Sequence, residues 1–425
     1  MNMIRRFLLG SQNTIDRDAF IWNMIGGMLN ACQSAILLVV ISHVAPVQDA
    51  GVFALAYAIA SLAVSLGKYG MRTFQSSDVN EKYSFSTYVS SRIITSILMM
   101  ALTVFYMIKG VFLLNYGYSK ILAILLVGLM KLIDTIEDVY HGRLQQRLRF
   151  DVAARCMAAR YIGTMLVIII ALVVSHDLLI SLLIGLLFTT VFYIYTCRVF
   201  NAFLDTEVRN YKVTKNTVHL LGECFSIAAG GFLAIYIANA PKYAIDAQLN
   251  ETVQAGFNYI FMPVYIVSTL SSFIFQPLIT RMAIYLDERR KDKIIKMFFT
   301  LLIAITGLSI VILLAGYFWG IPVLTIMYNY DLSGYKYAFM VLLIGGVLLA
   351  YGSFFNVCVV IFRKQNWLLI GYLIPAIVEM VTANRVVAVY GVTGVAFLYT
   401  GLILIQTLMF LIVLFLSCYK WNMER

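Results

Sequence analysis

The feature that most constrains this chain is its series of long apolar runs. A helix of about 20 mainly apolar residues is long enough to cross a bilayer. Runs of this kind fall at 20–43, 50–70, 88–114, 117–138, 152–175, 177–200, 217–240, 255–280, 294–317, 336–362, 367–388 and 391–418. The chain is 61% hydrophobic over 425 residues, which leaves a soluble core no room for so much apolar surface. The sequence therefore predicts an all-α polytopic membrane protein with about twelve transmembrane helices.

A polar joint separates the runs into two groups of six. We expect an N-terminal six-helix lobe over residues 1–204, a cytoplasmic linker over 205–215 and a C-terminal six-helix lobe over 216–425. The lobes share a short echo, because VQDAGVF at 47–53 opens the second run and VQAGF at 253–257 opens the eighth. Both lobes hold an even number of helices, which predicts a parallel pseudo-repeat about an axis along the membrane normal.

The positions of the cations predict the orientation. With the N-terminus in the cytoplasm, 27 of the 32 Lys and Arg residues fall on the inside, and the five others are Lys109, Lys120, Lys242, Lys336 and Arg385. This is the bias of positive charge toward cytoplasmic loops. The net charge of +11 therefore reports topology and contact with anionic lipid, not nucleic-acid binding. Both termini are predicted to be cytoplasmic.

The segment NAPKYAID at 239–246 places charges where the seventh and eighth helices are expected to meet. A charge in hydrocarbon costs about 2.5–3.5 kcal/mol on insertion scales, so it usually faces a cavity or a partner. Lys242 is one candidate contact for an anionic substrate, with Tyr243 and Asp246 beside it. The alternative is a lysine that extends to the outer interface.

A second candidate is a polar stripe on the second helix. Ser61, Ser65, Lys68 and Arg72 stand at i, i+4, i+7 and i+11, a spacing that shares one helix face. The stripe favours a water-filled vestibule that binds a phosphate, although the two cations alone are also typical of a cytoplasmic helix end.

The first helix carries a comparable polar face. Asn23, Gly27, Asn30 and Ser34 share it, and Arg17 lies just before them. Carboxamides in a membrane helix line a wet surface or hydrogen-bond to a neighbouring helix. Both interpretations fit the first helix.

Acidic residues inside apolar runs are candidates for ion coupling. Glu223 lies early in the seventh helix and Glu379 midway along the eleventh, and Glu379 is the favoured one. At the inner end of the fourth helix, Glu137 and Asp138 are expected to pair with Arg143 and its neighbours.

Motifs for covalent chemistry are not found in the sequence. It holds no P-loop, HExxH or G-x-S-x-G, which disfavours an ATP-driven pump and a protease. The six cysteines and four histidines are scattered, so we expect no metal site and no cofactor. The protein is not expected to be an enzyme, although a membrane-embedded glycan enzyme stays an alternative.

Four stretches resemble one known family. They are YGMRTFQSSD at 69–78, KYSF at 82–85, IEDVYHG at 136–142 and NAPKYAID at 239–246. They are similar to the polysaccharide-biosynthesis flippases of the multidrug/oligosaccharidyl-lipid/polysaccharide exporter (MOP) superfamily. The resemblance implies two six-helix lobes around a central cleft that opens alternately to either side of a bacterial cytoplasmic membrane. It implies a polyprenyl-diphosphate-linked oligosaccharide as substrate, a repeat unit of a cell-surface polysaccharide such as lipopolysaccharide O-antigen, moved from the inner to the outer leaflet.

In that family, the first, second, seventh and eighth helices line the cleft and supply cations for the diphosphate. Carried over, this role falls to Arg17, Arg72 and Lys242, and the repeat adds Arg281 at the end of the eighth helix as the counterpart of Arg72. Glu223 departs from the less charged segment expected in the family, which leaves its counter-ion open.

The expected partners follow from the resemblance. They are the polyprenyl-diphosphate-linked glycan, membrane lipids, and glycosyltransferases or a polysaccharide polymerase, with no nucleic acid. The main alternative function is a cation-coupled drug or metabolite antiporter of the same superfamily. It predicts an acidic cavity, whereas the stripe on the second helix is cationic.

Overall fold

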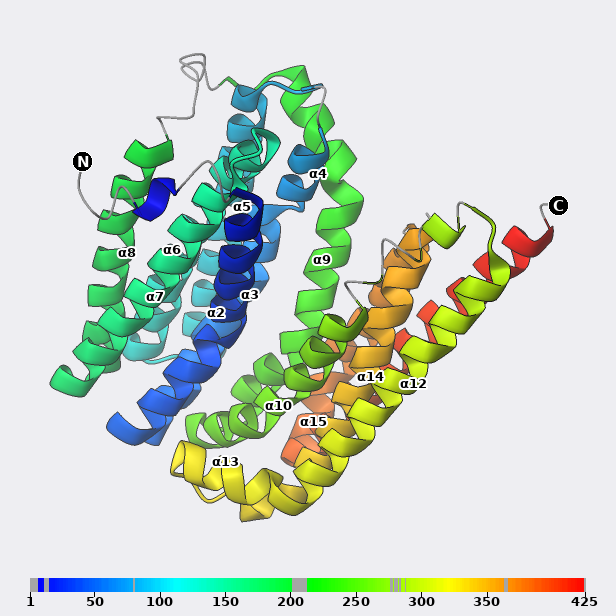
Figure 1. The fold of residues 1–425 in the computed structure, drawn as a ribbon. Coiled ribbons are helices and arrows are strands. Elements are labelled where there is room, and N and C mark those ends of the chain that lie inside the picture. Colours follow the sequence, from blue (N-terminus) through cyan, green and yellow to red (C-terminus); the bar gives the residue numbers. More distant parts are fainter. Residues whose placement is uncertain are drawn as a thin grey trace. The chain divides into compact units, whose positions relative to one another are not determined.

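The computed structural model describes residues 7–10, 15–78, 81–200, 212–275, 278, 282, 284–286, 288–362 and 366–423, and in these ranges it holds helices and no strand. The first lobe contains α2 (Ile15–Val44), α3 (Val47–Lys68), α4 (Met71–Ser77), α5 (Phe85–Leu113), α6 (Tyr118–Gln146), α7 (Phe150–Ser175) and α8 (Leu178–Phe200) (Figure 1). These helices cover the six runs expected in the first half of the chain.

The remaining helices are α9 (Lys215–Gln248), α10 (Glu251–Phe275), α12 (Lys291–Ala315), α13 (Ile321–Tyr328), α14 (Lys336–Ile361) and α15 (Asn366–Met423). A π-helical turn, Gly316–Gly320, joins α12 to α13, and a 3₁₀ turn, Ser333–Tyr335, precedes α14. α15 is two helices that meet at Gly391, whose φ of 57° and ψ of −146° suit glycine and almost no other residue.

The expected number of helices agrees with this fold. Ten helices of the described ranges are long and apolar enough to cross a membrane. That set counts α15 once and omits the more charged α6, so the two halves of α15 and α6 bring the number to about twelve. Large apolar side chains such as Phe105, Val174 and Phe318 are exposed, as expected for helices whose outer surface faces hydrocarbon.

By contacts the chain divides into two compact units, Met1–Ile235 and Tyr236–Arg425. The division falls inside α9, so the first two thirds of that helix belong to the N-terminal unit. The predicted linker at 205–215 lies outside the described residues up to 211, and the predicted lobe bounds stay a prediction.

α3 is the central helix of the N-terminal unit. Of its apolar window 72% is buried, against 22% for α5, and it packs against α2, α5 and α6. Its buried positions are rich in small residues, such as Ala54, Ala58 and Ala63, which let neighbouring helices approach closely. The C-terminal end of α3 is thereby placed beside α5 and α6, which carry several buried charges.

In the C-terminal unit, α10 and α15 both pack on α14. Gly346 of α14 meets the backbone of Val264, where an added Cβ would lie 2.8 Å from the carbonyl oxygen. That close approach brings the aromatic side chains of α10 against α15.

In both units every second connection is short. The chain turns between successive helices at 45–46, 114–117 and 176–177 in the first unit, and at 249–250, 329–332 and Gly391 in the second. The alternate connections include the longer stretches 201–214 and 276–290.

Candidate functional site

The polar stripe on the second helix is interrupted before Arg72. α3 ends at Lys68, and both Tyr69 (φ 52°) and Gly70 (φ 63°) adopt left-handed conformations before α4 begins. The continuous helix assumed from the spacing was therefore wrong. The hydroxyls of Ser61 and Ser65 donate to carbonyls of their own helix, at 2.7 and 2.6 Å. Their presence does not require a cavity wall.

The break directs Arg72 to the carboxylate of Asp138. An Nη of Arg72 lies 3.6 Å from one oxygen of Asp138, and Arg92 donates to the other oxygen at 2.8 Å. Arg92 also donates to the carbonyl of Gly67, at 2.5 Å, and so fixes the end of α3. Lys68 interacts electrostatically with Asp138 as well. The Arg72 side chain is 27% exposed and that of Arg92 only 2%, so Arg72 is the accessible edge of this group.

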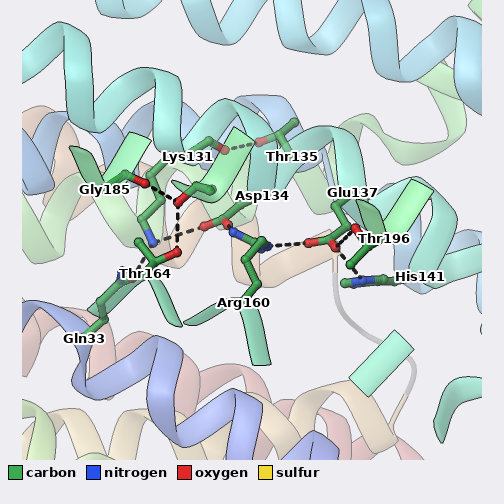
Figure 2. Close-up of polar contacts among 11 residues, drawn as sticks. Gln33, Lys131, Asp134, Thr135, Glu137, His141, Arg160, Thr164, Gly185 and Thr196 are labelled. Carbon is green, nitrogen blue, oxygen red and sulfur yellow. Dashed lines mark hydrogen bonds and ion pairs between the residues drawn. The ribbon is translucent and has the colours of Figure 1, made fainter. Parts of the chain in front are cut away.

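A second buried network adjoins the first on α6 and α7 (Figure 2). Arg160 bridges two carboxylates, Asp134 at 2.5 Å and Glu137 at 2.8 Å. Lys131 lies 3.2 Å from Asp134 and donates to the amide oxygen of Gln33 at 3.1 Å. His141 lies 3.7 Å from Glu137. The network lines a cavity of about 20 Å³, which has room for a single water molecule.

The pairing expected for Glu137 and Asp138 was wrong. Arg143 pairs instead with Glu81, at 2.8 Å. Asp138 and Arg143 are five residues apart on α6, which at 3.6 residues per turn separates them by roughly 140° around the helix. The two carboxylates consequently point into the unit, toward α5 and α7.

The two networks together carry surplus positive charge. Their three carboxylates, Asp134, Glu137 and Asp138, face five cations, so two positive charges are left over within the described residues. The five cations are Lys68, Arg72, Arg92, Lys131 and Arg160.

Three of these cations were missed as candidates from the sequence. Arg92, Lys131 and Arg160 each lie inside an apolar run, and an ionisable residue there is a functional candidate by itself. That signal was present. Their placement on α5, α6 and α7 brings them to the same buried centre.

Other predicted residues of the first unit lie apart from this centre. Arg17 is 70% exposed and pairs with Asp18 at 3.5 Å, and Asn23 is exposed on α2. Glu223 of α9 accepts a hydrogen bond from Lys82 at 2.6 Å and lies 3.4 Å from His219. Lys82 is thus the counter-ion of Glu223. The same hydrogen bond raises the pKa of Lys82 above its ordinary value.

Lys242 lies within a helix, not at a junction of two helices as the sequence suggested. α9 continues through Pro241 to Gln248, and Lys242 is 7% exposed. Its ammonium stands 5.6 Å from the centre of the Phe261 ring. Within the described part of the chain no carboxylate forms an ion pair with it. The cation is therefore held inside the protein over an aromatic ring, which favours the first of the two interpretations.

The residues around Lys242 are less buried. Tyr243 is half-buried, with its ring 6.4 Å from that of Tyr236, and Asp246 is half-buried one turn after Lys242. Arg281 lies outside the described residues.

Glu379 of α15 borders the same aromatic cluster. The cluster consists of Phe261, Tyr265 and Tyr399, with Phe261 5.5 Å from Tyr265 and 5.0 Å from Tyr399 between ring centres. Tyr265 and Tyr399 both interact electrostatically with Glu379. Glu379 is 1% exposed, and its Oε2 has no hydrogen-bond partner among the described residues. One buried cation and one buried acid thus flank the cluster without pairing.

The hydroxyl of Tyr265 ties this cluster to α9. It donates to the carbonyl of Ala238 at 2.9 Å, one turn before Pro241. Pro241 has no N–H, so the carbonyl of Ile237, four residues earlier, lacks its usual backbone donor. The Tyr265 hydroxyl binds the next carbonyl, that of Ala238, and so ties α10 to α9 beside the proline.

Comparison with solved structures identifies the architecture. The lipid II flippase MurJ in an inward closed conformation aligns with a TM-score of 0.69 at 15% identity, over 97% of this chain and 92% of that one. An inward-facing multidrug resistance MATE family transporter of the MOP superfamily aligns with a TM-score of 0.62 at 13% identity, over 95% and 98%. The chain has the fold of these transporters. No family model and no curated protein matches the sequence.

A third structure with the MATE/MurJ fold is a MOP superfamily transporter from Pyrococcus furiosus. It aligns with a TM-score of 0.54 at 14% identity, over 99% of this chain and 98% of that one, and is described as having a binding pocket of reverse polarity. These likenesses confirm the expected all-α polytopic class. At identities of 13–15% they show the fold alone.

Proposed function

We propose that this protein is a flippase that moves a polyprenyl-diphosphate-linked oligosaccharide from the inner to the outer leaflet by alternating access. The observation that carries the proposal is the surplus of two positive charges around Asp134, Glu137 and Asp138. Buried charges are normally paired. An uncompensated cationic centre suits an anionic ligand such as a diphosphate, and arginine forks match phosphate oxygens.

The accessible part of this centre is the binding group in the proposal. Arg72 and Lys68 are half-buried at the broken end of α3, while Arg92, Lys131 and Arg160 stay buried behind them. The buried cations fix the carboxylates, so Arg72 and Lys68 are free to exchange Asp138 for a ligand phosphate. Lys242 supplies a further cation in the C-terminal unit.

One fold neighbour supports a lipid substrate, because it is itself a lipid II flippase. The cationic centre of this chain supports a carrier of anions over an exporter of organic cations. Glycosyltransferases or a polymerase that make and use the glycan belong to the same proposal as partners.

The test is leaflet accessibility of a fluorescent polyprenyl-diphosphate sugar in proteoliposomes. Wild type is compared with Arg72→Gln and Lys242→Met. Lys336→Gln is the matched control, because it also removes one positive charge but lies at the first residue of α14, which carries neither Arg72 nor Lys242. We expect protein-dependent movement in wild type and control, and at least a tenfold lower rate in both test variants. Movement at the wild-type rate in both variants, with insertion verified, contradicts the proposal.

One observation favours the alternative of a cation-coupled antiporter. Glu379 is a buried acid without an ion-pair partner in the described ranges, and such acids in membrane helices often carry protons or cations. The antiporter predicts export of an organic cation driven by a sodium or proton gradient and abolished in Glu379→Gln. Lipid movement that needs no gradient and survives this substitution argues against it.

A further inference from the structure

The C-terminal unit contains an apolar groove that the proposed transport site does not use. It has a volume of about 390 Å³, within the range of about 300–1,000 Å³ typical of small-molecule sites. It lies between the beginning of α12, the end of α14 and the end of α15. Every described side chain that lines it is apolar or a cysteine, among them Phe298, Phe299, Cys358, Phe362, Leu411 and Phe415.

The groove is open on the side that faces the bilayer. Ile295, Phe299 and Phe415 line it and are also strongly exposed. An apolar cavity does not hold water, and in the membrane its natural contents are hydrocarbon. Its shape and chemistry therefore fit the chain of a lipid.

Cations stand at one end of this groove. On α12, Lys291 precedes the lining residues Ile294, Ile295 and Phe298 at i, i+3, i+4 and i+7, so it shares their helix face. The ammonium of Lys293 lies 5.4 Å from the ring of Tyr285, the neighbour of the lining residue Leu286.

We propose that this groove binds an anionic phospholipid of the cytoplasmic leaflet, with one acyl chain in the groove and the phosphate on Lys291 and Lys293. The bias of positive charge toward the cytoplasm explains cations at this end of the helices but not an apolar cavity of this size beside them. The combination of the two selects a ligand that has both a hydrocarbon chain and a negative headgroup. The occupant is a resident membrane lipid, and the inference does not depend on the transported substrate.

The experiment is native mass spectrometry of the full-length protein released from detergent micelles that contain equal amounts of phosphatidylglycerol and phosphatidylethanolamine. We expect phosphatidylglycerol adducts to survive preferentially. Lys291→Gln and Lys293→Gln should each weaken that binding about fivefold, as expected for one cation near an anionic surface. Lys336→Gln, at the opposite end of α14 from Phe362, should leave it unchanged.

A groove-filling variant separates a specific site from loose surface attraction. Leu411→Trp places an indole in the cavity and leaves the lysines in place, and its folding is checked by thermal unfolding. We expect it to lose the phosphatidylglycerol adduct. Equal retention of both phospholipids by wild type, or retention unchanged by the lysine and tryptophan variants, overturns the proposal. If added polyprenyl phosphate is retained while neither phospholipid is, the proposal is overturned as well, because the groove would then serve the tail of a transported lipid.

Discussion

The two units treat their buried charges in opposite ways. In the N-terminal unit Asp134, Glu137 and Asp138 each meet at least one cation within hydrogen-bonding distance or close to it. In the C-terminal unit Lys242 and Glu379 are equally buried but stand on either side of an aromatic cluster without pairing. Buried cations and carboxylates therefore form ion pairs in the N-terminal unit, whereas Lys242 and Glu379 of the C-terminal unit do not pair with each other.

This difference predicts opposite effects of substitution on the stability of the two units. A buried ion pair is destabilising to break, because the remaining charge loses its compensation. A buried charge without a partner lowers the free energy of unfolding, so replacing it with a neutral side chain should leave stability unchanged or raise it. Substitution of the fully buried, paired charges of the N-terminal unit should therefore lower stability, whereas substitution of Lys242 or Glu379 in the C-terminal unit should not.

The largest expected effect is that of Arg160→Met. It strands Asp134 and Glu137, and we expect a loss of about 3–5 kcal/mol, the usual cost of breaking a buried pair. Thermal unfolding followed by size-exclusion of a fluorescent fusion measures it. The double variant Arg160→Met/Glu137→Gln should recover much of the loss, since Asp134 keeps Lys131. A single variant as stable as wild type would show that the network does not stabilise the unit.

Next comes the pair of isolated charges. Lys242→Met and Glu379→Gln should unfold at or above the wild-type temperature, because each removes a buried charge that has no partner. Lipid transport should nevertheless fall at least tenfold in Lys242→Met, and it should survive in Glu379→Gln unless the protein is the cation-coupled antiporter. The comparison between the units fails if either substitution destabilises the protein as much as Arg160→Met does.

A smaller effect is expected at Arg72. Because Arg92 still holds Asp138 at 2.8 Å, Arg72→Gln should change stability by less than about 1 kcal/mol, as for other partly exposed pairs. Binding of a labelled polyprenyl diphosphate should weaken about tenfold. Arg72→Lys keeps the charge without the fork and should fall between the two. A large loss of stability with unchanged binding would make Arg72 a structural residue.

The smallest effect concerns the exposed pair of Lys82 and Glu223. Their hydrogen bond raises the pKa of Lys82, so its stabilisation is fully present below the ordinary lysine pKa of about 10.4 and is lost as the pH rises through the raised value. Wild type should be slightly more stable than Lys82→Gln near pH 7, and the two should converge in strongly alkaline buffer. A difference that grows with pH would contradict the pairing.

Helices were the easiest part to predict from the sequence, because each needs a run of apolar residues long enough to cross the bilayer. The run at 152–175, for example, corresponds to Phe150–Ser175. The run predicted at 50–70 ends close to the observed end of α3 at Lys68, but the polar stripe was wrongly carried past this end to Arg72.

The site residues that could be predicted from the sequence lie mainly in the C-terminal unit, and those that were missed lie in the N-terminal unit. Lys242 was recognised because the polar segment at 239–246 lies between two apolar runs, and Glu379 because it is the one acidic residue of the run at 367–388. The network around Arg160 was missed because its partners come from three helices, and pairing across helices leaves no pattern along the chain. The wrong partner for Asp138 arose from sequence proximity to Arg143, which helical geometry places on another side of α6.

The short alternate connections have a consequence for recognition from outside. With the orientation that the charge bias predicts, the turns at 45–46, 114–117, 176–177, 249–250 and 329–332 lie on the outer side, and all of them are short. Proteases cut preferentially at exposed loop tips, and each of these turns has only a few residues. Even Gly391 turns the chain without a loop. The described part of the chain therefore offers few sites on that side to a protease or an antibody.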